Sequence, residues 1–248
     1  MKVIAFLGPT LTASDALAVL GCEIRPPAAQ GDVLRATLDG ADMIGLIDGY
    51  FEHVPAVWHK EILFAMSEGV HVLGAASMGA LRAAELCDFG MEGVGRVFAD
   101  YRSGAIEADD EVAVAHASHE HRFRQSSEAL VNIRATLAAA EAAQVLRAAT
   151  RSGLLVAARS LYYPDRTYQR LVALGEAAGL ASAELQQLCE FLDAGGRVDQ
   201  KRLDALALLE ALRARVAEGI APKQVRYRFE HTDAWEELLT AVAKQPAE

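Results

Sequence analysis

Ser77 stands in a setting that is typical of a catalytic nucleophile. It follows an apolar run and precedes a segment with helical spacing, in the order Ala75-Ala76-Ser77-Met78-Gly79. A strand that turns into a helix presents a serine hydroxyl in this way in the G-x-S-x-G turn, although alanine takes the first position here. The N–H groups of Met78 and Gly79 would lie at the helix start, where they could stabilise an oxyanion. Alternatively, Ser77 only caps the helix, and both uses compete for one hydroxyl.

A nucleophilic serine requires a base, and Lys60 is the candidate. No histidine has an evident relation to Ser77. Lys60 precedes Leu63 and Phe64 by three and four residues in a helix predicted over residues 55–68, whose polar stripe would be Glu61 and Glu68. Apolar neighbours disfavour the charged form of an amine, which would make Lys60 a usable base. The alternative is a lysine whose ammonium reaches water.

Two other clusters have the residue types for binding. His116, His119 and His121 lie close together, so a metal site is conceivable, but a solvated polar loop is the simpler interpretation. The acidic run at positions 107 and 109–111 reads as a solvated face, with a docking patch for a basic partner as the alternative. Gly8-Pro9-Thr10 is not followed by Gly-Lys-Ser/Thr, so the sequence does not support a phosphate-binding loop for ATP.

The elements around these residues predict an α/β fold. Buried strands predicted at 3–7, 43–47 and 71–73, with a short strand at 23–25, alternate with helical patterns at 15–20, 32–38, 55–68 and 79–86. This alternation is typical of a parallel sheet flanked by helices, whose ligands bind at the carboxyl ends of the strands. Segments 8–10, 48–50 and 74–77 would meet there.

The second half of the chain is predicted to be helical throughout. Helical patterns cover residues 130–149, 168–178, 183–192, 202–218 and 233–243. We therefore expect a catalytic α/β core over residues 1–121 and an all-helical region over residues 122–248, packed on that core.

Composition excludes several classes of function. The 248 residues carry a net charge of −10, which disfavours nucleic acid as the main partner. The three cysteines are odd in number and lack metal-ligand spacing, as expected in a reducing compartment. The N-terminal apolar run is too short for a signal peptide, and no stretch is long enough to span a bilayer. We expect a cytoplasmic protein without a membrane segment.

The order of the motifs is similar to that of the TfuA family. The resemblance covers roughly the first 135 residues and is specific because many separate motifs agree. It rests on the motifs Phe6-Leu7-Gly8-Pro9-Thr10, Arg25-Pro26-Pro27-Ala28, Ile47-Asp48-Gly49-Tyr50-Phe51, Val54-Pro55-Ala56-Val57-Trp58-His59-Lys60-Glu61-Ile62, Gly74-Ala75-Ala76-Ser77-Met78-Gly79-Ala80-Leu81-Arg82-Ala83-Ala84-Glu85-Leu86 and Gly90-Met91-Glu92-Gly93-Val94-Gly95.

The resemblance implies a specific activity. TfuA-like proteins accompany YcaO enzymes, which activate a peptide backbone amide with ATP and convert it to a thioamide. The TfuA-like protein is understood to supply sulfide by hydrolysing the thiocarboxylated C-terminus of a ThiS-like carrier protein, and to strengthen the binding of substrate by YcaO. The family's active site is described as a Ser–Lys pair, and the matching positions are Ser77 and Lys60. No cofactor is implied.

The remaining site residues follow from this reaction. A thiocarboxylate is anionic, so Arg25 and Arg82 are candidates for binding it. Asp48 and His59 are expected to orient Lys60 or the carrier tail, and Gly8 and Thr10 to line the site at the strand ends.

Two other functions remain open from sequence. The protein could be a non-catalytic adaptor that recruits the sulfur carrier and enhances substrate binding by YcaO. It could be an unrelated hydrolase or nucleotide-binding domain with the same order of strands and helices. A persulfide route through Cys22 or Cys87 is disfavoured because neither lies at a strand end.

Overall fold

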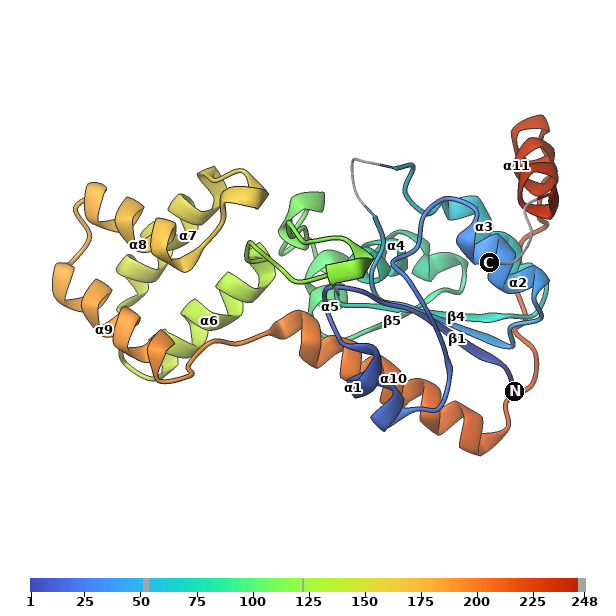
Figure 1. The fold of residues 1–248 in the computed structure, drawn as a ribbon, viewed down its shortest axis with the longest axis horizontal. Helices are drawn as coiled ribbons and strands as arrows, with labels where there is room; N and C mark the ends of the chain where they lie inside the picture. The colour runs from blue at the N-terminus through green and yellow to red at the C-terminus, as the bar shows by residue number, and fades with distance from the viewer. Residues whose placement is uncertain (51–53, 122, 245–248) are drawn as a thin grey trace. The chain divides into compact units, whose positions relative to one another are not determined.

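The computed structural model describes residues 1–50, 54–121 and 123–244; Phe51, in one of the family motifs, lies outside them. Its N-terminal part forms a parallel sheet in the order β2-β1-β3-β4-β5 (Figure 1). The strands are β1 (Val3–Phe6), β2 (Glu23–Arg25), β3 (Met43–Leu46), β4 (His71–Ala75) and β5 (Glu92–Val94). The prediction of an α/β fold with a parallel sheet, followed by a helical half, is confirmed.

Two helical layers cover the sheet. Alternate strand residues face α1 (Ala13–Val19) and the long helix α10 (Gln200–Glu218) on one side. The other residues face α2 (Asp32–Leu38), α3 (His59–Ser67) and α4 (Met78–Leu86). In β3, Gly45 lets α10 approach closely, because a Cβ there would lie 2.8 Å from Leu212 Cδ1. The sequence and sheet therefore agree that both faces of the strands are buried.

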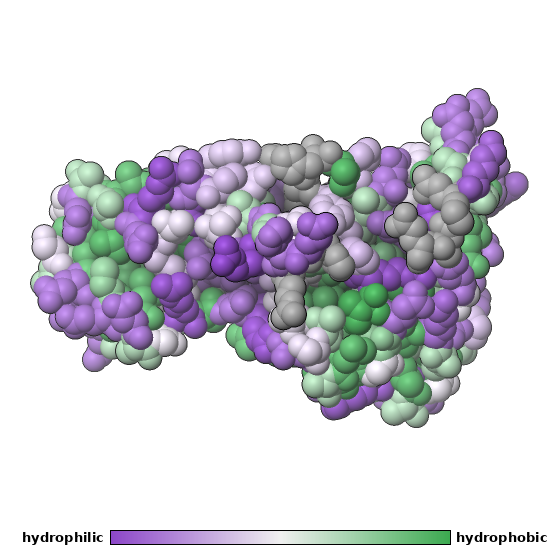
Figure 2. All heavy atoms as spheres, viewed as in Figure 1, coloured by the Kyte–Doolittle hydropathy of each residue, from purple (hydrophilic) through white to green (hydrophobic). Residues whose placement is uncertain are grey.

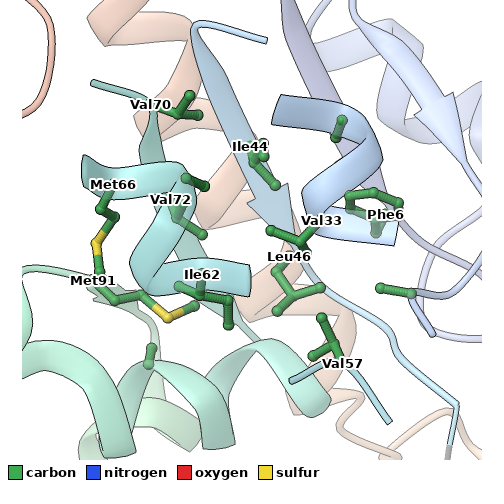
Figure 3. Close-up of a cluster of buried hydrophobic side chains, with 14 of the residues drawn as sticks. Phe6, Val33, Ile44, Leu46, Val57, Ile62, Met66, Val70, Val72 and Met91 are labelled. Carbon is green, nitrogen blue, oxygen red and sulfur yellow. The ribbon is translucent and has the colours of Figure 1, made fainter. Parts of the chain in front are cut away.

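The core beneath α2 and α3 is made of interdigitating aliphatic side chains. Figure 3 shows Ile44 and Leu46 of β3 between Val33 of α2 and Ile62 of α3, with Met66 and Met91 alongside each other at one end. This packing fixes α3 against the sheet and so sets where its first turn, which carries His59 and Lys60, can lie.

Residues 107–201 form a second compact unit. Its helices are α6 (Leu130–Ala142), α7 (Ala148–Ser160), α8 (Tyr168–Ala177) and α9 (Ser182–Asp193), with short 3-10 turns at Asp109–Glu111, His119–His121 and Tyr163–Asp165. They enclose a core of leucines and alanines, including Leu137, Leu154 and Leu188. The helix predicted over residues 130–149 is two helices, because Gln144 adopts a left-handed conformation with φ of 61° and ends α6.

The first unit comprises residues 1–106 and 202–248. The chain therefore returns to the sheet after the helical unit, through α10 and α11 (Asp233–Lys244), whereas the sequence-based division placed everything after residue 121 in one region. The unit also contains β5, which was not predicted as a strand, the 3-10 turn Cys87–Phe89 and α5 (Arg96–Arg102). Within the described ranges, no helix combines the length and apolarity needed to cross a membrane.

Candidate functional site

The turn between β4 and α4 is tight and strained. Ala76 has a φ of 67°, a left-handed conformation that a residue with a Cβ adopts at a cost of about 1–2 kcal/mol. The N–H of Ser77 donates to the carbonyl of Ala75, only two residues back, at 2.7 Å. Strain of this kind is concentrated at functional sites, where the surrounding structure holds it in place. Here it carries the chain into the helix with Ser77 at the corner.

The Ser77 hydroxyl is not used to cap α4. Ser77 occupies the N-cap position, yet its side chain makes no capping hydrogen bond, whereas Thr12 and Thr167 do accept such bonds at the starts of α1 and α8. The residue is only 4% exposed. Its oxygen is also not among the fully buried unpaired side-chain atoms of the described residues, which are in His71, Arg151 and Trp235. Within the described part of the chain, the hydroxyl therefore has no hydrogen-bond partner.

The two expected oxyanion donors differ in availability. The Gly79 N–H donates to the carbonyl of Ile47 at 3.2 Å, so it is already used. Met78 has no acceptor for its N–H within the described part of the chain. The expectation for Gly79 is thus corrected: its N–H fastens α4 to the end of β3, and Met78 remains the available donor.

Gly79 has a packing role as well. A Cβ at this position would lie 1.7 Å from the Leu46 carbonyl oxygen, and a Cβ at Gly74 would lie 2.1 Å from the Gly79 carbonyl oxygen. Both contacts are with backbone, which cannot rotate away. The first turn of α4 therefore rests directly on β3 and β4, and glycine is required at both positions.

Asp48 joins the loops that follow β1 and β3. Its carboxylate is buried and accepts hydrogen bonds from the N–H groups of Gly8 and Thr10 at 2.9 and 3.0 Å and from the Thr10 hydroxyl at 2.5 Å. The structure therefore brings Gly8, Thr10 and Asp48 together at the carboxyl edge of the sheet, where the strand order reverses between β1 and β3. Asp48 therefore stabilises the loop at Gly8–Thr10 and does not pair with Lys60.

Lys60 lies in the first turn of α3, but its side chain does not meet Ser77. The Lys60 Nζ donates to Thr232 Oγ1 at 3.0 Å and lies 5.4 Å from the centroid of the Phe229 ring. Among the described residues no hydrogen bond joins Lys60 to Ser77. The expected apolar pocket around the amine is therefore replaced by contact with the C-terminal segment.

His59 and Arg82 meet at Glu85 of α4. The Glu85 carboxylate contacts His59 Nε2 at 2.8 Å and accepts from Arg82 at 2.7 Å, while Arg82 Nε donates to the Val57 carbonyl. Burial alone would raise the pKa of Glu85, but its bonds to His59 and Arg82 outweigh burial and hold that pKa below its usual range. Glu85 was missed from sequence, although its spacing of three from Arg82 was a signal.

Arg25 is the last residue of β2 and is paired in register with Phe6 of β1. Its guanidinium pairs with Glu23 and with Asp39 at 2.6 and 2.7 Å. The Asp39 backbone carbonyl also accepts from Lys2 Nζ, so the Arg25 guanidinium belongs to a cluster with residues that flank β1 and α2. These ion pairs already engage the Arg25 guanidinium. Arg82, the other expected arginine, lies on α4, the helix that follows Ser77.

Glu61 is a buried acid that the helical wheel placed on the polar face. It is 0% exposed and accepts from the N–H groups of Leu34 and Trp58, at the starts of α2 and α3. Burial raises the pKa of Glu61 to about 7, although hydrogen bonds from the backbone of Gly31, Trp58 and Leu34 oppose this. The Glu61 carboxylate thus accepts hydrogen bonds at the N-termini of two helices, where the helix dipole favours a negative charge.

The acidic run and the histidine cluster lie in the second unit. Asp110 pairs with the buried Arg166, and Glu111 is buried and forms a double hydrogen bond with Arg134. The run therefore fastens its own segment to the helices and is not a continuous docking face. Among the described residues, no group of three His, Cys, Asp or Glu side chains could hold a metal, and the His119 side chain lies outside the described residues.

The chain was compared with curated proteins and with protein families. No curated protein matches this chain. The family model described as TfuA-like protein matches residues 48–167, which begins later and ends later than the motifs quoted from sequence. The match includes Asp48, Lys60, Ser77 and Arg82, but leaves out the loop at Gly8–Thr10 and the segment that contacts Lys60. Over residues 48–167, just under half of its length, the chain is similar to the TfuA-like protein family.

Proposed function

We propose that this protein hydrolyses the thiocarboxylated C-terminus of a ThiS-like carrier protein and supplies the sulfide to a YcaO enzyme for thioamidation of a peptide backbone. The observation that carries the proposal is the uncommitted hydroxyl of Ser77, at a strained strand-to-helix turn within the family match. A serine that only capped the helix would use this hydroxyl on the first-turn N–H groups.

The reaction would proceed in two steps. The Ser77 oxygen attacks the thiocarboxylate carbon and loses its proton to a base, the carbon–sulfur bond breaks, and sulfide leaves with that proton. Water then cleaves the acyl ester, which returns Ser77 and a carrier carboxylate. The N–H of Met78, which has no acceptor among the described residues, would stabilise the oxygen that becomes negative in each step.

Lys60 is the proposed base, and it would have to leave Thr232 to act. The start of α3 and the turn at Ser77 share the carboxyl edge of the sheet, and lysine has four rotatable carbon–carbon bonds with which to change direction. Arg82 would contribute positive charge near the anionic carrier end. We propose that the reaction takes place in the cytoplasm, where free thiols and thiocarboxylates persist.

Sulfide release tests this proposal directly. Purified protein and thiocarboxylated carrier are incubated without YcaO, and released sulfide is measured for wild type, Ser77→Ala and Lys60→Ala. Ser103→Ala is a matched control, because Ser103 is an exposed serine after α5. The proposal predicts release by wild type and Ser103→Ala, and a loss of at least about 100-fold in Ser77→Ala. Equal release from Ser77→Ala and wild type would contradict it.

A non-catalytic adaptor is the second candidate. The contact of Lys60 with Thr232 favours it, because Ser77 then has no hydrogen bond to a base among the described residues. An adaptor would bind the carrier and YcaO equally well as wild type and as Ser77→Ala, and neither would release sulfide.

A further inference from the structure

The chain after α10 lies along the whole length of α3. We call residues 219–244 the C-terminal strap; it consists of the irregular segment 219–232 and α11. Lys223 N–H donates to the Gly69 carbonyl beyond the end of α3, and Tyr227 donates to the Leu63 carbonyl in its middle, at 2.8 and 2.6 Å. Thr232 accepts from Lys60 at its start. The strap therefore runs from the amino edge of the sheet toward the edge that carries Ser77.

Aromatic side chains anchor the strap. Trp235 is fully buried, with ring centroids 4.9 Å from Phe64 and 6.4 Å from Trp58, and Phe229 lies 5.3 Å from Phe64. The opposite side of α11 is charged, and Figure 2 shows hydrophilic residues over it. Because this anchor buries several large rings, it holds the strap in place independently of any contact with Lys60.

The contact with Lys60 is weak by comparison. It consists of one hydrogen bond at an exposed position and one ammonium above a ring face. Interactions of these two kinds together shift an equilibrium between two side-chain positions by roughly tenfold. A preference of this size is large enough to keep Lys60 on the strap most of the time and small enough for a bound partner to overcome.

We propose that the strap is an autoinhibitory element: Phe229 and Thr232 hold Lys60 away from Ser77, and the enzyme becomes active when Lys60 leaves them. This inference rests on the proposed hydrolase function, and it concerns how that site is controlled. The strap need not detach, because only the Lys60 side chain must rotate while Trp235 stays buried.

Two variants weaken the contact: the first leaves every ring of the anchor in place, and the second removes one of its rings while Trp235 and Phe64 remain. Thr232→Val keeps the side-chain shape and removes the hydrogen-bond acceptor, and Phe229→Leu keeps an apolar side chain and removes the ring face. Thr240→Val is the control, since Thr240 is an exposed threonine of α11. Each is measured by the rate at which an amine-reactive reagent labels Lys60, mapped by mass spectrometry, and by sulfide release from thiocarboxylated carrier.

The proposal predicts that both variants label Lys60 several-fold faster and release sulfide up to about tenfold faster than wild type. Adding Lys60→Ala to Thr232→Val should abolish the gain in sulfide release, and Thr240→Val should match wild type. Unchanged labelling of Lys60 in both variants would overturn the proposal.

The two proposals fail in different ways. If labelling rises while Ser77-dependent sulfide release stays at the wild-type rate, the strap does not control the site, although the hydrolase function stands. If no protein, including Thr232→Val, releases more sulfide than Ser77→Ala, the hydrolase function itself is wrong and autoinhibition falls with it.

Discussion

Replacing Gly79 with alanine would place a methyl group against the backbone of β3. The new Cβ would lie 1.7 Å from the Leu46 carbonyl oxygen and 2.6 Å from the Leu46 carbonyl carbon. A carbon–oxygen contact needs about 3.3 Å, so the first turn of α4 must move by about 1.6 Å. Neither partner can avoid this by rotating a side chain, because the obstacle is backbone.

The cost can be worked out from the contacts that this movement breaks. The hydrogen bond from Gly79 N–H to Ile47 is already 3.2 Å long and would be lost, at about 1 kcal/mol. Overpacking against backbone adds about 3 kcal/mol, the upper end of its usual range. Alanine regains about 1 kcal/mol through its helix propensity. The net loss is about 3 kcal/mol, which lowers the melting temperature by roughly 6–12 °C.

Urea unfolding followed by tryptophan fluorescence measures this loss. The chain has two tryptophans, Trp58 and Trp235, and both lie in the sheet unit with Gly79, so the signal reports on that unit. Gly21→Ala is the matched control, because a Cβ at Gly21 meets nothing within 4 Å. It should change stability by less than about 1 kcal/mol. A loss of under about 1 kcal/mol in Gly79→Ala would refute the close approach of α4 to β3.

Three further predictions follow from single residues. Asp48→Ala removes three hydrogen bonds to a buried carboxylate and should cost about 3 kcal/mol or more in urea unfolding, with Asp48→Asn losing about 1 kcal/mol. The pKa of Glu61 is about 7 in the folded protein, compared with an ordinary value of 4.5. The contribution of Glu61 to the free energy of unfolding should therefore be largest below about pH 4.5 and should fall as the pH rises to about 7. The fall should be on the order of 3 kcal/mol, and Glu61→Gln should flatten the pH profile of unfolding; an unchanged profile would refute it. Gln144→Gly relieves a left-handed φ and should stabilise the helical unit by about 0.5–1 kcal/mol in thermal unfolding followed by circular dichroism, whereas a destabilisation would contradict the strain.

The sheet could be predicted from sequence where strands are buried on both faces. Residues 3–7 and 43–47 contain β1 and β3, and the strand predicted at 71–73 is the first part of β4. β5 could not be recognised in the same way, because only Val94 in Glu92–Val94 is apolar and the strand is three residues long. The break at Gln144 also lacks a signal, since glutamine rarely adopts a left-handed conformation.

The candidate site was only partly predictable. The meeting of Gly8, Thr10 and Asp48 follows from the rule that the carboxyl ends of parallel strands share one edge. The partner of Lys60 could not be foreseen, because Thr232 lies 172 residues further along the chain. Helical spacing placed Glu61 on the polar face of α3. Spacing within one helix carries no information about the start of a second helix, α2, whose Leu34 N–H donates to Glu61.

Trapping the acyl intermediate on Ser77 tests the central claim most directly. Wild-type protein is mixed with thiocarboxylated carrier, quenched with acid within seconds and digested, and the peptide containing Ser77 is examined by mass spectrometry. The hydrolase account predicts an ester between the Ser77 oxygen and the carrier C-terminus, formed as sulfide is released and absent from Ser77→Ala. Sulfide release at the wild-type rate by Ser77→Ala, with no adduct on Ser77 in wild type, would contradict it.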